Sequence, residues 1–191
     1  MKKYIIALSV LFLALTVNAQ EVIWKFTYDV GIPFADTKEF TDQMSWRGLT
    51  LDFDRFVGQN LAIGMGFSWS TFVEKEPDSY YETDLLLLHG TQVRYNNNIP
   101  LTVKIAYYKP VNTLELFGSL GVGTVWQETR REIGTFAFTG SNWQFALVPE
   151  VGVLIPAGQT NIAARVRYVS GFKTDNAPAL SYLSFGLGFG W

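Results

Sequence analysis

The stretch Leu61-Ala-Ile-Gly-Met-Gly-Phe-Ser-Trp-Ser70 alternates a large apolar residue with a small residue at every step. Successive side chains of a β-strand point to opposite faces, so this period of two predicts a strand with one aliphatic and one small, polar face. Seven further segments carry the same alternation: 21–33, 48–55, 99–107, 114–127, 143–155, 162–168 and 183–191. The sequence therefore predicts an all-β chain of eight strands.

The connections between these strands alternate in length. Those at 56–60, 109–113 and 156–160 are short, and those at 35–45, 74–92, 129–142 and 174–181 are longer and more polar. Short turns at one end and long loops at the other are typical of an antiparallel up-and-down barrel in the bacterial outer membrane. This pattern predicts that both termini are periplasmic. The apolar run Leu85–Leu88 either extends the barrel wall or forms a small lid, and the sequence leaves both open.

The first residues have the order of a secretory signal. Lys2 and Lys3 precede an apolar run over residues 4–16, and Val17-Asn18-Ala19 supplies small residues for cleavage. The alternative, a membrane anchor, needs about 20 apolar residues, which this run does not reach. We expect a cleaved signal peptide over residues 1–19 and one barrel domain over residues 20–191.

The alternation of apolar and small residues does not show which face of the strands lies inside the barrel. A soluble, lipocalin-like barrel would bury the aliphatic face, whereas a membrane barrel turns that face outward. The polar face is rich in glycine, for example Gly64 and Gly186, and a crowded eight-stranded interior needs small residues. Aromatic residues lie at the ends of the predicted strands on the aliphatic face. They predict two belts of aromatic side chains at the level of the lipid headgroups. These residues are Trp24, Phe34, Trp69, Tyr107, Trp126, Trp143 and Trp191. These features favour the transmembrane barrel; Trp46 and Tyr182 are out of phase and require a bulge or a loop.

With the aliphatic face outward, nine charged residues point inward: Lys25, Asp29, Asp52, Asp54, Lys104, Glu115, Glu150, Arg165 and Arg167. Buried charges need partners, so we expect a hydrogen-bonded network that fills the lumen. Asp52 and Asp54 share a face and could instead bind a metal. We prefer ion pairs, because facing charges in a lumen usually compensate one another.

Four segments resemble the small outer-membrane β-barrel domain family: 98–108, 116–124, 149–154 and 187–191. This family includes outer-membrane protein X and A type barrels and many "porin family" proteins. The resemblance spans essentially the whole mature chain and implies the fold and the location, but no single function. It also implies that Phe189 and Trp191 present a terminal assembly signal to the barrel-assembly machinery. Phenylalanine is the usual last residue, and Trp191 departs from it.

Composition excludes several chemistries. The sequence has no cysteine, which excludes disulfides and zinc–thiolate sites, and its net charge of −2 offers no basic excess for nucleic acid. Catalytic barrels need a base near a nucleophile, and the single histidine, His89, has no positioned nucleophile in sequence. We therefore predict no catalytic, cofactor-binding or metal-binding residues.

The leading hypothesis is a non-enzymatic outer-membrane protein, surrounded by lipid, that acts in envelope structure or binds external partners through its long loops. A narrow pore for small solutes is the alternative. A lipid-modifying barrel enzyme is a third. The sequence does not identify the external partner.

Overall fold

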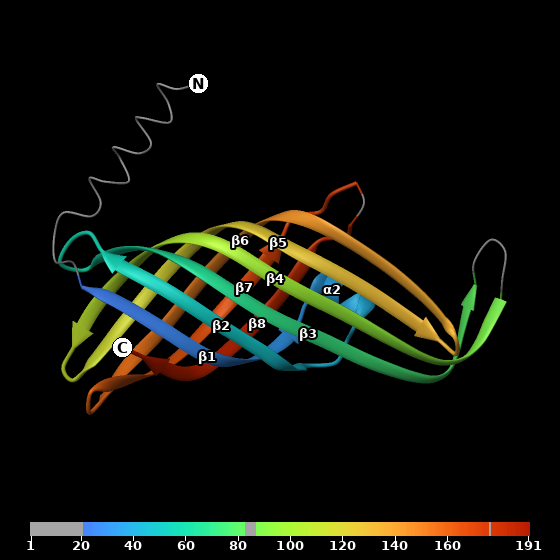
Figure 1. Ribbon diagram of the computed structural model, residues 1–191, viewed down its shortest axis with the longest axis horizontal. Helices are drawn as coiled ribbons and strands as arrows, with labels where there is room; N and C mark the ends of the chain where they lie inside the picture. Colours follow the sequence, from blue (N-terminus) through green and yellow to red (C-terminus); the bar gives the residue numbers. More distant parts are fainter. Residues whose placement is uncertain (1–20, 83–86, 176) are drawn as a thin grey trace, which may run out of the picture.

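The computed structural model describes residues 21–82, 87–175 and 177–191, which form eight strands and one short helix (Figure 1). The predicted signal peptide, residues 1–19, lies outside the described residues. The elements are β1 Val22–Pro33, α2 Ala35–Phe40, β2 Ser45–Phe56, β3 Leu61–Glu82, β4 Leu87–Val111, β5 Leu114–Ile133, β6 Phe136–Ala157, β7 Thr160–Gly171 and β8 Leu180–Gly190.

The strands form a closed barrel in sequence order. Every neighbouring pair is antiparallel, and β1 closes the ring by pairing with β8, where Lys25 lies opposite Gly190. A closed ring has no free edge in the bilayer, so all backbone polar groups there can pair within the sheet. The predicted eight-stranded up-and-down barrel is confirmed. The start of β1 and the C-terminus lie at the end with the short turns (Figure 1).

Four strands are much longer than the alternation predicted. β3 to β6 have 20 to 25 residues each and extend the wall far beyond the other strands (Figure 1). The prediction of a loop over 129–142 is wrong, because β5 and β6 continue to a two-residue turn at Gly134 and Thr135. Gly134 adopts φ 58°, a left-handed conformation that glycine tolerates. The predicted loop over 74–92 is also largely a strand ladder.

The apolar run Leu85–Leu88 lies only partly within the described residues. Leu87 pairs with Glu82 and Leu88 with Tyr81, so this part of the run extends the wall. Leu85 and Leu86 lie outside the described residues.

Helix α2, in the first long loop, lies across the mouth of the barrel. At one side, the backbone N–H groups of Ala179 and Ser181 donate to Asp36 Oδ2 and Thr37 Oγ1, at 3.1 and 2.7 Å. At its other end, the Phe40 ring lies 5.6 Å from the guanidinium of Arg131 on β5. Because β5 lies opposite β1 and β8 in the ring, α2 bridges the opening. The sequence predicts only a loop here.

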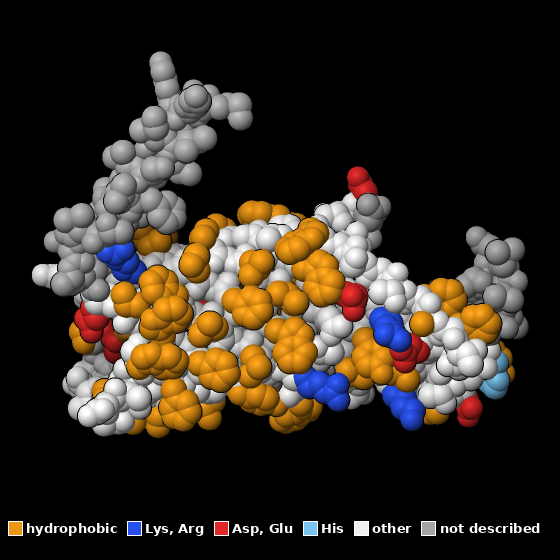
Figure 2. Space-filling model, in the orientation of Figure 1, with side chains coloured by type: hydrophobic (Ala, Val, Ile, Leu, Met, Phe, Trp, Pro, Cys, Tyr) orange, Lys and Arg blue, Asp and Glu red, His pale blue; other side chains and the backbone are white. Residues whose placement is uncertain are grey.

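The aliphatic side chains face outward along the strands. Met65 and Ile105, for example, have exposed fractions of 58% and 60%. Apolar side chains cover the barrel wall on the face drawn in Figure 2, while charged side chains gather toward its ends. This surface is suited to lipid and confirms the transmembrane orientation over the lipocalin-like one.

The two out-of-phase aromatic residues have different explanations. The register between β1 and β2 shifts between Asp29 and Gly31, and this bulge turns Trp46 and Arg47 both outward. The expectation of a bulge or loop at Tyr182 is wrong. Its side chain points into the barrel and packs against Phe72, with ring centroids 5.3 Å apart.

Candidate functional site

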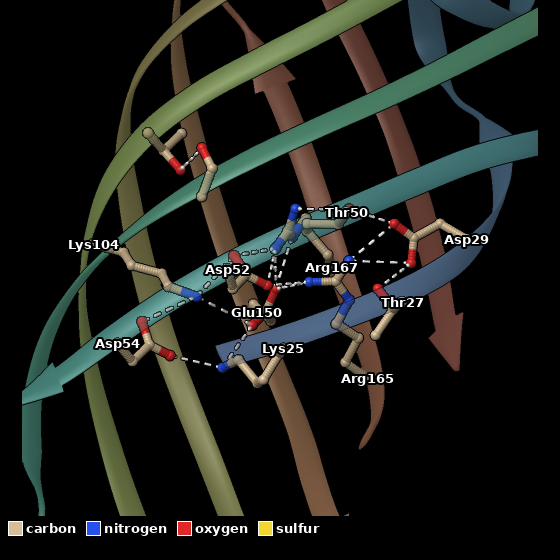
Figure 3. A network of polar contacts seen from close by, with 12 residues as sticks. Lys25, Thr27, Asp29, Thr50, Asp52, Asp54, Lys104, Glu150, Arg165 and Arg167 are labelled. Carbon is tan, nitrogen blue, oxygen red and sulfur yellow. Dashed lines mark hydrogen bonds and ion pairs between the residues drawn. The ribbon is translucent and has the colours of Figure 1, made fainter. Parts of the chain in front are cut away.

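A network of buried charges crosses the middle of the lumen (Figure 3). Its members come from β1, β2, β4, β6 and β7, and their side chains converge because each occupies an inward position of its strand. They are Lys25, Asp29, Asp52, Asp54, Lys104, Glu150, Arg165 and Arg167, all buried.

The two arginines of β7 bind three carboxylates. Arg165 Nη1 lies 2.6 Å from Asp52 Oδ2 and 3.0 Å from Glu150 Oε2, and its Nη2 lies 2.9 Å from Asp29 Oδ2. Arg167 donates from Nε to Glu150 Oε2 at 2.7 Å and from Nη2 to Asp52 at 3.1 Å. The planar fork of arginine suits such multiple carboxylate contacts.

The two lysines occupy the other half of the network. Lys25 Nζ lies 2.7 Å from Asp54 Oδ2 and donates to the hydroxyl of Tyr108 at 2.8 Å. Lys104 Nζ lies 2.9 Å from Asp52 and 3.2 Å from Asp54. Asp52 thus joins the lysine half to the arginine half.

Glu115, the ninth predicted residue, lies apart. Among the described residues it forms no ion pair, and its position near the start of β5 leaves it half-buried. The eight residues that the structure brings together comprise four positive and four negative charges, so their charges balance.

Glycine makes room for this network. A Cβ atom on Gly64 would lie 2.0 Å from Asp54 Oδ1, and one on Gly186 would lie 2.2 Å from Asp29 Oδ1. Both distances are far below van der Waals contact. At these two positions a side chain would displace the carboxylate that lies against the strand.

Two apolar layers, which the sequence analysis missed, flank the network. The layer toward the short turns contains Ile23, Ala62, Ala106, Tyr108, Phe117, Leu154 and Ala163. The layer toward the mouth contains Phe72, Val125, Ala146, Val148, Val169, Leu180 and Tyr182. The alternation could have identified several of these residues, because they occupy inward positions of their strands. Ile23 is in phase with the inward Lys25, and Val125 is in phase with the inward Gly121.

An amide layer lies above the second apolar layer. Gln127 Nε2 donates to Asn96 Oδ1 and Gln144 Nε2 donates to Gln127 Oε1, both at 3.2 Å. Gln144 also donates to the backbone oxygen of Pro178 in the last loop, at 2.7 Å. The charge network, the apolar layers, the amide layer and helix α2 across the mouth together fill the lumen. A cavity between Asp29, Ser70 and Tyr182 has a volume of only about 10 Å³, the space of one water.

The predicted belt aromatics lie on the outer face at two levels of the barrel, and those in β3, β5 and β6 lie inside these long strands rather than at their ends. The level near the short turns contains Trp24, Tyr107 and Trp191. The level near the end of the barrel from which β3 to β6 extend contains Phe34, Trp69, Trp126 and Trp143. Six of them have exposed fractions of 37 to 58%. Trp126 is less exposed and lies opposite Trp143 in the ladder.

The residues of the predicted assembly signal lie at the closure of the barrel. Trp191 exchanges two backbone hydrogen bonds with Trp24, at 2.8 and 2.9 Å, and Phe189 pairs with Phe26. We expect deletion of Trp191 to reduce insertion several-fold, because it removes the last backbone pair that seals β8 to β1. Trp126→Ala removes only a side chain and should reduce insertion less. The heat-modifiable band in the outer-membrane fraction measures insertion, and equal losses in the two variants would contradict this role.

His89 lies on the extended β3–β4 hairpin, apart from the carboxylates in the lumen. The His89 ring stacks on Tyr80 with centroids 4.3 Å apart, on the extended β3–β4 hairpin. Within residues 21–82, 87–175 and 177–191, no three His, Asp or Glu side chains are grouped to hold a metal ion. No helix in the same residues is long and apolar enough to cross a membrane.

In the described part of the chain, β3 and β6 form the two edges of the extended sheet beyond their pairing with β2 and β7, and these edges differ in charge and proline content. On the β3 edge, residues 73–82 carry five charged residues, Pro77 and a bulge with Asp78 at φ 53°. On the β6 edge, residues 136–145 contain no charge and no proline. Charges, proline and bulges are the usual means of blocking strand addition at an edge. Only the β3 edge is blocked in this way.

Among the described residues, the outer side of β6 at residues 137–143 pairs with no further strand. Described β7 residues pair with β6 only from Ala146 onward, and the oxygen of Phe145 accepts from Phe172 N–H at 2.9 Å. Because backbone groups alternate in direction along a strand, Trp143, Ser141, Thr139 and Ala137 also point away from β5. These residues present a row of donors and acceptors.

A closed eight-stranded barrel with an aliphatic outside and a charged, filled inside is the fold of the small outer-membrane β-barrels. The chain is similar in structure to Neisserial surface protein A, at 8% identity, with a TM-score of 0.54 over 91% of this chain and 98% of that protein. It is also similar to Ail, the attachment invasion locus protein of Yersinia pestis, in complex with the heparin analogue sucrose octasulfate. That identity is 14%, with a TM-score of 0.50 over 90% and 97% of the two chains. No family model and no curated protein matches the sequence.

Proposed function

We propose that this chain is a non-enzymatic outer-membrane protein that binds an extended segment of an external protein at the free edge of β6. The unprotected edge, residues 137–143, is the observation that carries the proposal. Strand addition uses main-chain hydrogen bonds for affinity and neighbouring side chains for specificity. Both ends of the mature chain are then periplasmic, and the extended sheet projects outside the cell.

The filled lumen supports a surface role over the alternative of a pore. A channel needs continuous polar volume, whereas the layers described above occupy the interior from the short turns to α2. His89 stacks on Tyr80 near the end of the β3–β4 hairpin, away from the carboxylates of the lumen, and this position supports binding over lipid-modifying catalysis.

Proline at the edge tests this proposal. Ser141→Pro removes one outward N–H and places a ring where an added strand would lie, while proline on an edge strand leaves the β5 ladder intact. We expect peptides selected on the wild-type protein in lipid nanodiscs, from a displayed random library of about nine residues, to lose binding to Ser141→Pro. Ser141→Ala keeps the N–H and is the matched control.

Bound peptide should also slow amide exchange at Thr139, Ser141 and Trp143. Peptides that bind wild type and Ser141→Pro equally would overturn the edge as the binding site. Failure to select any peptide above the Ser141→Pro background would do the same.

A further inference from the structure

The side chains that the β6 edge turns outward are short above Trp143. Ala137, Thr139 and Ser141 lie on the same outer face as Trp143, and all three are exposed. A strand added to β6 would place its outward side chains directly beside them. Because the β6 side chains are short, a long side chain of the added strand can pass over them and reach the next strand of the sheet, β5.

The β5 residue behind Ser141 is a positioned carboxylate. Glu128 lies directly opposite Ser141 in the ladder. The hydroxyl of Thr71 on β3 donates to Asn97 Oδ1 at 2.6 Å, and Nδ2 of Asn97 on β4 donates to Glu128 Oε1 at 3.3 Å. These hydrogen bonds follow one row of the sheet from β3 to β5, so they hold the Glu128 carboxylate in the row that ends at Ser141.

This outer face carries a net negative charge. Beyond Trp126, β5 turns Glu128, Arg130 and Glu132 outward, and residues 136–145 of β6 contain no charged side chain. Arg130 forms an ion pair with Glu132. In the described ranges 21–82, 87–175 and 177–191, Glu128 forms no ion pair, and it is only partly buried. The charge available to an added strand is therefore the carboxylate of Glu128.

The barrel side of the same face is aromatic. Trp143 is 58% exposed and lies opposite Trp126 in the ladder. Both belong to the aromatic level from which β3 to β6 extend. An added strand therefore meets an apolar surface opposite Trp143 and, two residues farther along the extension, a carboxylate behind Ser141.

We propose that the segment that adds to β6 carries a lysine or arginine opposite Ser141 and an apolar residue opposite Trp143. This inference rests on the proposed function, because the backbone of the added strand brings both side chains to the sheet. Neighbouring strands lie about 4.8 Å apart, so the residue opposite Ser141 lies roughly 10 Å from Glu128. A lysine or arginine stem covers this distance across Ser141, and the pairing of opposite charges supplies specificity.

The direction of the added strand fixes the order of these two residues. β6 runs from Phe136 toward Ala157, so an antiparallel segment passes Trp143 first and Ser141 two residues later. Antiparallel pairing is slightly more stable per residue than parallel pairing. We therefore expect an apolar residue that is followed, two positions later, by the basic residue.

The peptide selection described above also tests this inference when it is carried out in nanodiscs of zwitterionic lipid, which do not attract basic peptides by charge. We expect the selected peptides to share this order of residues. Replacing their Lys or Arg with Gln should weaken binding to wild type about fivefold, the effect of a partly exposed ion pair. Glu128→Gln should remove the difference between the basic and the Gln peptides. Glu39→Gln, which removes the same charge from an exposed position of α2, is the matched control and should keep the difference.

The outcomes separate the two proposals. Peptides that lose binding to Ser141→Pro but show no basic preference, or a preference that Glu128→Gln leaves unchanged, would overturn the basic residue and leave strand addition intact. Peptides whose basic preference disappears only in Glu128→Gln, and whose binding is lost in Ser141→Pro, support both. Basic peptides that bind wild type and Ser141→Pro equally would overturn both, because they recognise charge without the β6 backbone.

Discussion

Arg165→Ala should lower the free energy of unfolding by about 3–5 kcal/mol, the usual cost of removing one partner from a buried ion pair. The guanidinium contacts Asp29, Asp52 and Glu150, and all three carboxylates are buried. After the substitution the network holds three positive and four negative charges in a lumen that solvent does not reach. Urea unfolding in detergent micelles, followed on gels by the heat-modifiable band, measures the loss.

The matched control for this prediction is Arg130→Ala. Arg130 pairs with Glu132, but its side chain is 50% exposed on the outer face of the extended sheet. Exposed pairs contribute about 1 kcal/mol or less, so the unfolding midpoint should change little. Similar midpoints for wild type, Arg165→Ala and Arg130→Ala would show that the lumen charges do not stabilise the barrel.

Gly64→Ala should lower the free energy of unfolding by about 3 kcal/mol, the upper end of the usual cost of overpacking. The new Cβ would lie 2.0 Å from Asp54 Oδ1 and 2.3 Å from the backbone oxygen of Phe53. A carboxylate can rotate, but the backbone oxygen belongs to the β2–β3 ladder and cannot move without breaking its pairing. The folded fraction recovered after refolding into detergent measures the effect.

Gly140→Ala provides the comparison for this substitution. There the nearest atom would be Thr129 Oγ1 at 3.6 Å, so the methyl group fits, and alanine in place of glycine slightly favours the strand. We expect its folded fraction to equal that of wild type. Equal recovery of Gly64→Ala and Gly140→Ala would contradict the close packing of β2 carboxylates against β3.

The barrel itself could be predicted because lipid imposes a simple pattern. Strands that cross the bilayer must turn aliphatic residues outward at every second position, and residues 61–70 and 183–191 show this without interruption. The same alternation places Lys25, Asp52 and Arg165 on the inner face. Their particular partners depend on strand register and could not be read from one sequence.

Outside the bilayer the pattern disappears, although the strands continue. The sequence predicts a loop around Arg130, Arg131, Gly140 and Ser141. A strand whose outer face is exposed to water does not need aliphatic residues on that face, so the alternation is absent. The backbone ladders of β3 to β6 reveal the extended sheet and the β6 edge. Helix α2 has six residues, too few for a helical period to stand out from a polar loop.

A filled lumen that does not conduct ions distinguishes the proposed surface role from a pore. Single-channel recording of the purified protein in planar bilayers tests this claim most directly. Eight strands leave an interior that side chains can fill, in contrast to porins of about 16 to 18 strands with aqueous channels. We expect wild type to show no steady open state. A stable, well-resolved open state in wild type would contradict the filled lumen and would make a small-solute pore the better account.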